Sequence, residues 1–171
     1  MAAIVCSALD AAGHTAVLTG GGAATVYSSG AYQSRDLDFV FAFWSEGAVP
    51  EAPLLDLGFR REGQSYVHPL SPLTLDFPTG PLAVGEDLIT RWDTLSVENR
   101  KLHILSPTDC VRDRLSAFYH WNDFSSLEQA LLVAREQPVD LEVIREWSVR
   151  EGCADKADLF LARLAQSQGG V

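Results

Sequence analysis

The sequence is poor in cysteine, in basic residues and in long apolar runs, and each shortage excludes a class of protein. Only three of its 171 residues are cysteines, Cys6, Cys110 and Cys153, and no two of them form a C-x-x-C pair. Their odd number and wide spacing argue against a disulfide framework and against a cysteine-ligated zinc site. We therefore expect three buried thiols in a reducing compartment.

Long apolar segments are also missing. No run approaches the roughly 20 apolar residues that a membrane-spanning helix requires. The stretch Met1–Gly13 is apolar but lacks a basic n-region, so it does not have the pattern of a signal peptide. These observations predict a cytoplasmic protein with no membrane partner.

Positive charge is scarce. The chain has 13 Lys and Arg residues against 23 Asp and Glu residues, which gives a formal net charge of -10. Proteins that bind long nucleic acids usually present a basic face. We therefore expect no extended DNA binding, although a local basic cleft can still hold a smaller anion. The apolar content of 47% is sufficient for the core of one domain of this length, with or without a helical appendage.

The most informative stretch is residues 18–43, L-T-G-G-G-A-A-T-V-Y-S-S-G-A-Y-Q-S-R-D-L-D-F-V-F-A-F. It predicts, in order, a buried strand, a glycine turn, a short helix and a second strand, over His14–Thr19, Gly20–Gly22, Ala23–Ser28 and Asp36–Phe43. Glycines between a strand and a helix allow backbone N–H groups to approach a phosphate closely, because no side chain intervenes. This order therefore indicates a phosphate-binding turn.

The second strand carries two acids, Asp36 and Asp38, that are two residues apart. Residues at this spacing project from the same face of a strand and lie about 7 Å apart, near enough to share a divalent cation. The strand is otherwise apolar, with Phe39 and Phe41 following the acids. Carboxylates buried side by side without a counter-charge are costly, so a cation is their natural partner. Taken alone, a glycine triplet is often only a tight turn, and an Asp-x-Asp pair is often a solvated strand edge.

The remaining pattern predicts an α+β fold, a mixed β-sheet with flanking helices over residues 1–105 followed by a helical bundle over residues 106–171. The elements expected in the first part are a helix, a short helix, two hairpins and a further strand: Ala2–Ala12, Leu54–Leu57, Phe59–His68, Leu95–Leu105 and Leu73–Phe77. A loop is expected over Glu46–Pro53.

The helical part contains clear helix-start signals. Ser106 is an N-cap followed by Pro107 at the first helical position, and this helix is expected to continue to about Trp121. The sequence Ser125–Glu128 has the pattern of a capping box for a second helix, to about Arg135. Further helices are expected after Asp140 and from Ala154 to Ala165, before a frayed tail over Gln166–Val171.

Gly21-Gly22, followed after thirteen residues by Asp36-Leu37-Asp38, resembles the signature of the nucleotidyltransferase superfamily, which has the DNA polymerase beta-like fold. The version found here looks most similar to compact bacterial nucleotidyltransferases, including the toxin-type members of toxin–antitoxin systems. The specific resemblance covers roughly residues 15–80. It implies a mixed sheet of the superfamily type and transfer of a nucleotidyl group.

The resemblance also implies roles for individual residues. Asp36 and Asp38 would be ligands of Mg²⁺ or Mn²⁺. The superfamily uses a third carboxylate on a neighbouring strand as a metal ligand or base, and Asp76 matches it. Gly21 and Gly22 match the phosphate turn. Ser34 matches a serine that lies close to the phosphates in the bacterial nucleotidyltransferases.

Arg114 stands where related proteins often have a lysine that reaches the phosphates. Arginine can bind phosphate in bidentate fashion, so the role is compatible with the change. The alternative interpretation is a surface ion pair with Asp113 or Asp109. The sequence leaves both open.

The predicted partners are a nucleoside triphosphate and a hydroxyl acceptor, and the acceptor can be a protein, a tRNA end or a small molecule. A second hypothesis is a non-catalytic nucleotide-binding or partner-binding module, such as a toxin–antitoxin component. A third starts from Asp36 as the nucleophile of a haloacid-dehalogenase-like phosphatase. That hypothesis leaves the glycine triplet unexplained, and no later Lys and Asp-Asp set accompanies it.

Overall fold

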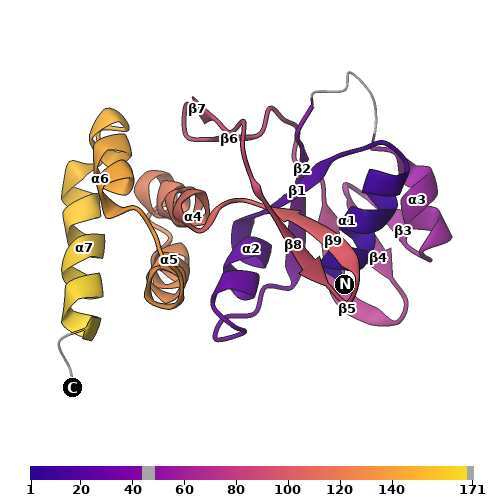
Figure 1. The fold of residues 1–171 in the computed structure, drawn as a ribbon, viewed down its shortest axis with the longest axis horizontal. Coiled ribbons are helices and arrows are strands. Elements are labelled where there is room, and N and C mark those ends of the chain that lie inside the picture. Colours follow the sequence, from indigo (N-terminus) through magenta and orange to yellow (C-terminus); the bar gives the residue numbers. More distant parts are fainter. Residues whose placement is uncertain (44–48, 169–171) are drawn as a thin grey trace.

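A computed structural model describes residues 1–43 and 49–168. Its helices are α1 (Ala2–Ala11), α2 (Gly20–Tyr27), α3 (Glu51–Asp56), α4 (Pro107–Trp121), α5 (Phe124–Glu136), α6 (Leu141–Arg150) and α7 (Ala154–Gln168). Its strands are β1 (Ala16–Thr19), β2 (Asp36–Phe41), β3 (Arg60–Glu62), β4 (Ser65–His68), β5 (Ser71–Asp76), β6 (Ala83–Val84), β7 (Asp87–Leu88), β8 (Asp93–Val97) and β9 (Arg100–Ile104). The α+β class is confirmed, and Figure 1 shows the sheet at one end of the molecule and α4–α7 at the other.

The main sheet has seven strands in the order β3-β4-β5-β2-β1-β9-β8. It is mixed, because β2 pairs with β1 in antiparallel fashion and with β5 in parallel fashion. In the second pairing Asp36 lies opposite Thr74 and Asp38 lies opposite Asp76. The parallel pair is therefore the place where the two predicted groups of acids meet.

Helix α2 connects the two parts of the molecule, since it packs against β1 and β2 and also against α4 and α5. A Cβ atom added to Gly22 would lie 3.0 Å from Leu18 Cδ1 and 3.2 Å from Leu37 Cδ2. Glycine at this position therefore lets the helix approach the sheet closely. The buried phenol of Tyr27, at the other end of α2, donates a hydrogen bond of 2.7 Å to the carbonyl of Leu105.

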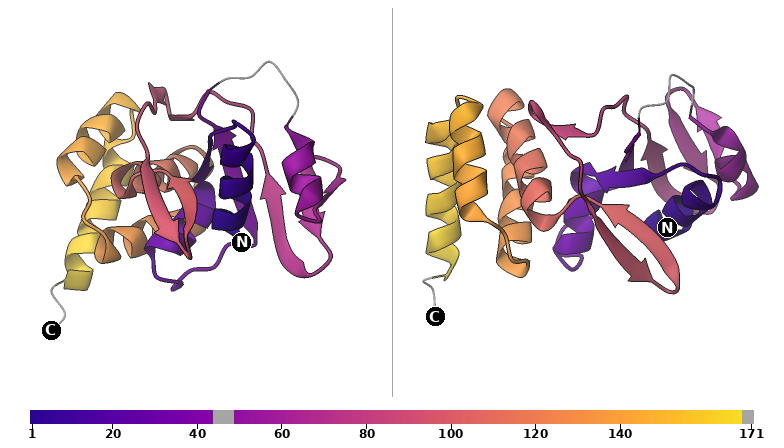
Figure 2. Two further views of the ribbon diagram at one scale, coloured as in Figure 1. Left: turned by 45° about the vertical axis from the view of Figure 1, so that its right-hand side comes forward. Right: turned by 45° about the horizontal axis from the view of Figure 1, so that its top comes forward.

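The helices of the second part form two pairs. Helix α4 packs against α5, and α6 packs against α7, with further contacts between the two pairs. The turned views in Figure 2 show α6 and α7 side by side on the outer side of α4 and α5. Among residues 1–43 and 49–168, no helix combines the length and apolarity needed to cross a membrane.

The predicted helix starts are confirmed at Ser106 and Asp140, whose side chains accept hydrogen bonds from backbone N–H groups of α4 and α6. The predicted capping box at Ser125 is wrong. Asp123 caps α5, and its Oδ1 accepts from the backbone N–H groups of Ser125 and Ser126 at 2.9 and 3.3 Å. The Asp123 carboxylate thereby satisfies two of the four N–H groups that lack a partner at a helix start, and the helix begins at Phe124, before the serines.

Some predicted boundaries differ from the observed ones. The glycine triplet belongs to the first turn of α2 and does not precede it, and the chain changes direction at Gly20, where φ is +64°. Helix α3 begins at Glu51, inside the predicted loop, and α7 continues through the start of the predicted tail to Gln168. The remainder of that loop up to residue 48, and of that tail from residue 169, lies outside the described residues.

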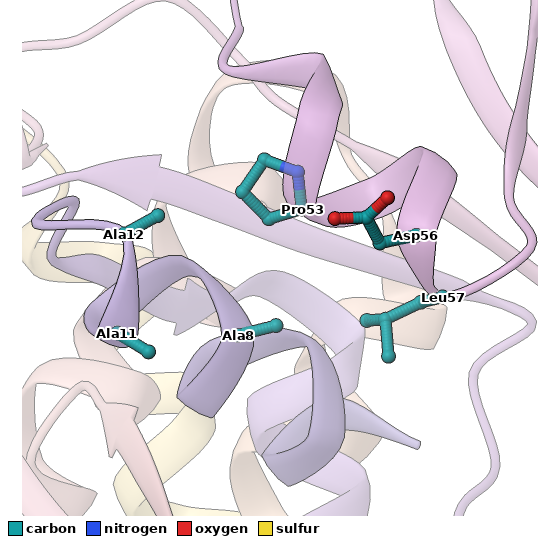
Figure 3. A pocket seen from close by; sticks show the side chains of 6 residues that line it. All are labelled: Ala8, Ala11, Ala12, Pro53, Asp56 and Leu57. Atoms are coloured by element: carbon teal, nitrogen blue, oxygen red, sulfur yellow. The ribbon is translucent and has the colours of Figure 1, made fainter.

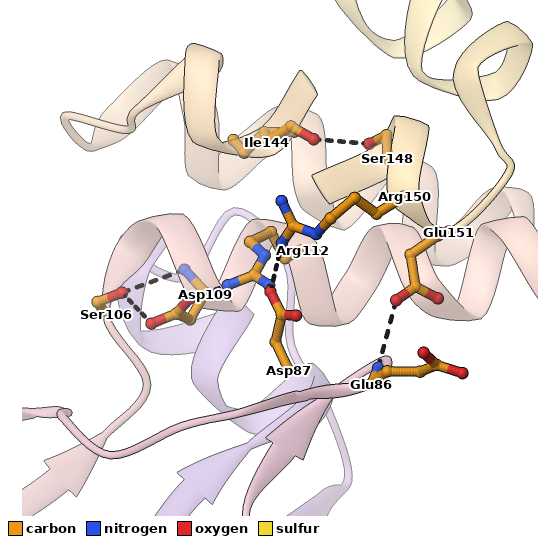
Figure 4. Close-up of polar contacts among 9 residues, drawn as sticks. All are labelled: Glu86, Asp87, Ser106, Asp109, Arg112, Ile144, Ser148, Arg150 and Glu151. Carbon is orange, nitrogen blue, oxygen red and sulfur yellow. Dashed lines mark hydrogen bonds and ion pairs between the residues drawn. The ribbon is translucent and has the colours of Figure 1, made fainter. Parts of the chain in front are cut away.

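The short β6–β7 hairpin joins the sheet end of the molecule to the helices through a group of ion pairs (Figure 4). The Arg112 side chain is only 6% exposed, and it donates from Nη1 to Asp109 Oδ1 at 2.8 Å and from Nη2 to Asp87 Oδ2. Asp87 Oδ2 also accepts from Arg150 Nη2 at 2.7 Å. The Arg112 guanidinium lies over the Trp147 ring, 5.1 Å from its centroid. Arg112 is therefore the buried centre of this connection.

We expect Arg112→Ala to lower the free energy of unfolding by about 3–5 kcal/mol, because it leaves two carboxylates without their buried partner. The matched control is Arg150→Ala, which removes a 56% exposed partner of Asp87 and is expected to cost about 0–1 kcal/mol. Urea unfolding of both variants measures the difference. Equal losses of unfolding free energy in the two variants would show that burial of Arg112 does not increase its contribution to stability.

Candidate functional site

Three carboxylates lie on one face of two neighbouring strands. Asp38 on β2 is paired with Asp76 at the end of β5, and paired residues of parallel strands project to the same face. Asp36 projects from that face as well, because it lies two residues before Asp38. Asp36 Oδ1 accepts a hydrogen bond of 2.5 Å from Thr74 Oγ1, which holds it over the same pair of strands. The strand pairing thus assembles all three acids that the sequence indicates.

The surroundings of Asp38 disfavour its ionised form. Burial raises the pKa of its carboxyl from the ordinary 3.8 to about 6, and repulsion from Asp76, Asp113 and Asp36 acts in the same direction. The guanidinium of Arg114 opposes the shift. Ionised Asp38 is therefore short of positive charge in its surroundings, and a cation bound beside it would relieve this deficit.

The turn between β1 and α2 lies directly against Asp38. A Cβ atom at Gly20 would collide with the Asp38 carboxylate, and the positive φ of Gly20 also favours glycine. The Gly20 N–H donates to Asp113 Oδ2 at 3.1 Å. The start of α2 therefore directs a backbone donor toward the same region as the acids.

The structure separates the two glycines that the sequence assigns to phosphate binding. A Cβ atom at Gly21 would lie 2.9 Å from Ser34 Oγ, and Ser34 Oγ in turn accepts the backbone N–H of Asp36 at 3.3 Å. Gly21 and Ser34 are thus neighbours at the acid pair. Gly22 faces the apolar core, so its lack of a side chain has a packing reason.

Arg114 projects from α4 and is part of a partly buried ion pair. Its Nε and Nη2 donate to Asp113 Oδ2 at 3.0 and 2.7 Å, and its Nη1 lies 3.5 Å from Ser126 Oγ. The side chains of Arg114 and Asp113 are only 17% and 22% exposed. The ion pair with Asp113 exists, but it lies in the site and not on the open surface.

These groups border a pocket of about 290 Å³ between the strand ends and α4. Its wall is formed by Thr19, Gly20, Asp38, Val40, Pro78, Thr79, Pro81, Ala83, Asp113 and Arg114. Of the residues that the sequence indicates, Asp38 and Arg114 line the pocket, whereas Asp36, Asp76 and Ser34 lie outside its wall. The sequence placed Gly20 in the glycine turn but matched only Gly21 and Gly22 to the phosphates, and it named Asp113 only as an alternative ion-pair partner of Arg114.

The donor set fits a hard divalent cation, because it consists of carboxylate oxygens on one face and includes one carboxylate that lacks compensating charge. In their present positions, no three His, Cys, Asp or Glu side chains of the described segments are arranged to hold a metal ion. The carboxylates would therefore have to turn toward one another to share a cation.

A second hollow, of about 310 Å³, lies between α1 and α3 (Figure 3). It is lined by Ala8, Ala11, Ala12, Pro53, Asp56 and Leu57. Its mostly small, apolar wall presents one carboxylate and no basic side chain, so it does not suit a polyphosphate. The pocket at Asp38 is the better candidate for the functional site.

No family model and no curated protein matches the sequence, but the structure resembles solved ones. A crystal structure of an antigenic nucleotidyltransferase-like protein from Paracoccidioides brasiliensis matches with a TM-score of 0.59 and 13% identity, over 97% of this chain and 86% of that one. The solution structure of the antibiotic-resistance factor ANT(2'')-Ia matches with a TM-score of 0.50 and 13% identity, over 96% and 89%. The chain therefore has the fold of the nucleotidyltransferase superfamily.

Proposed function

We propose that this protein is a Mg²⁺-dependent nucleotidyltransferase that transfers a nucleoside monophosphate from a nucleoside triphosphate to a hydroxyl acceptor. The observation that carries the proposal is the pairing of Asp38 with Asp76 next to a pocket that also contains the Gly20 turn and Arg114. A carboxylate face beside a backbone donor and a guanidinium matches the needs of a magnesium triphosphate. The superfamily fold agrees with this chemistry.

In this proposal Asp36, Asp38 and Asp76 hold the metal ion. When bound, the ion supplies a positive charge that offsets the charge of the phosphate oxygens. Arg114 and the backbone N–H groups of the glycine turn bind the phosphates, and Ser34 lies beside them. Together, these side chains and backbone groups orient the α-phosphorus toward the acceptor.

The reaction forms one bond and breaks one. The acceptor oxygen attacks the α-phosphorus, the bond to the bridging oxygen breaks, and pyrophosphate leaves with the electron pair of that bond. The proton of the acceptor hydroxyl passes to a carboxylate, which we assign to Asp76. The acceptor is a hydroxyl of a protein, of a tRNA end or of a small molecule.

The experiment that tests the function uses nucleoside triphosphates labelled at the α-phosphate, with Mg²⁺ and three acceptor samples: a cell lysate, total tRNA and a set of polyhydroxylated small molecules. Label transferred to one acceptor, with release of pyrophosphate, is the expected result. Tight Mg²⁺-dependent nucleotide binding without transfer to any acceptor would favour a non-catalytic binding module. Absence of nucleotide binding would reject the proposal.

We expect Asp76→Asn to reduce transfer by about 100-fold or more while a magnesium triphosphate still binds. A base removes the acceptor proton only as the transition state forms, so its loss affects turnover more than ground-state binding. Single-turnover transfer and calorimetric titration separate the two effects. The control is Asp56→Asn, in the hollow between α1 and α3, which should leave both unchanged. Transfer at the wild-type rate would exclude Asp76 as the base.

Arg114→Ala is expected to raise the dissociation constant of the triphosphate several-fold, because an arginine on the phosphates contributes from the moment of binding. Arg163→Ala is the matched control, since it removes an equal charge from an exposed pair with Glu128. Calorimetry with a non-hydrolysable analogue measures both. If the two variants bind alike, Arg114 has no contact with the phosphates.

The raised pKa of Asp38 predicts a pH-dependent stability in the absence of metal. Because its folded-state value of about 6 exceeds the ordinary 3.8, the native state loses stability as the pH rises from about 4 through 6. Asp38→Asn should therefore be more stable than wild type above about pH 6, by about 1–2 kcal/mol after solvent screening, and equal to it below about pH 4.

Thermal unfolding across this pH range tests the prediction, and Asp56→Asn, which removes an exposed carboxylate, is the matched control for the loss of one charge. Mg²⁺ added at pH 8 should raise the melting temperature of wild type by mass action and should have little effect on Asp38→Asn. An equal response of both proteins to Mg²⁺ would place the metal elsewhere.

A further inference from the structure

One oxygen of Asp113 accepts three hydrogen bonds in the site. Asp113 Oδ2 accepts from the backbone N–H of Gly20 at 3.1 Å and from Arg114 Nε and Nη2 at 3.0 and 2.7 Å. Gly20 and Asp113 are 93 residues apart in the sequence, and the contact joins the start of α2 to the middle of α4. Asp113 therefore connects the glycine turn to the arginine.

The donors that hold Asp113 are of the kind that hold a phosphate oxygen. An N–H group at the start of a helix and the fork of a guanidinium are both typical anion-binding groups. In the proposed function, Arg114 and the glycine turn bind the triphosphate. The Asp113 carboxylate thus occupies donors that the phosphates require.

Charge makes joint occupancy unfavourable. Gly20, Asp38, Asp113 and Arg114 line the same pocket, in which two carboxylates stand against one guanidinium. A triphosphate brings several more negative charges, and in this partly buried place like charges repel strongly. A metal ion at Asp38 would balance some of that charge, but the Asp113 carboxylate lies on the side of the donors.

We propose that Asp113 is an internal substitute for a phosphate, a carboxylate that fills the phosphate-binding donors until a nucleotide displaces it. The proposal rests on the proposed function, since it concerns the same site. When the triphosphate binds, the Asp113 carboxylate releases the Gly20 N–H and Arg114, and a phosphate oxygen takes its place. Asp113 thereby lowers the affinity for nucleotide and keeps the empty site ordered.

A positioning role for Asp113 predicts the opposite sign. If its carboxylate only holds Arg114 in the direction of the phosphates, removal of its charge loosens Arg114 and weakens nucleotide binding. If Asp113 competes with the phosphates, removal of its charge strengthens binding. The direction of the change therefore distinguishes the two roles.

The test compares wild type, Asp113→Asn and Glu128→Gln by calorimetry with a non-hydrolysable triphosphate analogue and Mg²⁺. Asparagine keeps the size of the side chain and an acceptor oxygen for Gly20, but loses the charge that competes with phosphate. We expect the dissociation constant of Asp113→Asn to be about tenfold lower than that of wild type, a change of about 1.4 kcal/mol. Glu128→Gln removes the same charge from an exposed pair with Arg163 and should bind like wild type.

An unchanged or raised dissociation constant for Asp113→Asn, with wild type binding the analogue, overturns the substitute role and leaves the proposed function standing. Absence of binding to all three proteins overturns the proposed function and the substitute role together. Binding to Asp113→Asn alone supports both.

A second measurement does not depend on the folding of a variant. NMR of the wild-type protein can follow the backbone amide of Gly20 and the carboxyl carbon of Asp113 while the analogue is added with Mg²⁺. Displacement predicts that both signals shift, because the hydrogen bond between them is lost. If other signals shift and so show that the analogue binds, while these two signals stay unmoved, the proposal is overturned.

Discussion

The parallel pairing of β2 with β5 is the constraint on which the candidate site depends. It places Asp38 opposite Asp76 and Asp36 opposite Thr74, so that acids from two separate segments emerge from one face. A shift of one residue in either strand would turn its acid toward the other face. The apolar residues that alternate with the acids, Leu37 and Phe39, are buried and hold the register.

Together with burial, the same pairing leaves ionised Asp38 short of compensating positive charge. Asp38 is crowded by other carboxylates, and within the pocket wall Arg114 is the basic side chain that faces it. A site of this kind has surplus affinity for cations and opposes the entry of an unaccompanied polyphosphate. In a magnesium triphosphate the cation offsets part of the phosphate charge, which makes the proposed substrate more compatible with the acidic balance of the chain.

The site is shared by the two parts of the molecule. Asp38 and Gly20 come from the sheet and the start of α2, whereas Arg114 and Asp113 come from α4. The β6–β7 hairpin adds Ala83 to the pocket wall and is bound to the helices through Arg112. The position of the helical part relative to the sheet therefore determines the distance between Arg114 and Asp38.

The sequence by itself determined the local features, because these depend on residues close together in the chain. The order of strand, glycines, helix and acid pair, the common face of Asp36 and Asp38, and the helix start at Ser106 all follow from short-range geometry. The resemblance implied that Asp76 lies on a strand next to Asp36 and Asp38. Tertiary structure alone decided the register of that pairing, the packing reason for Gly22 and the contact of Asp113 with Gly20. Those features arise where remote segments pack together, and no local pattern encodes the distance or the charge that they meet there.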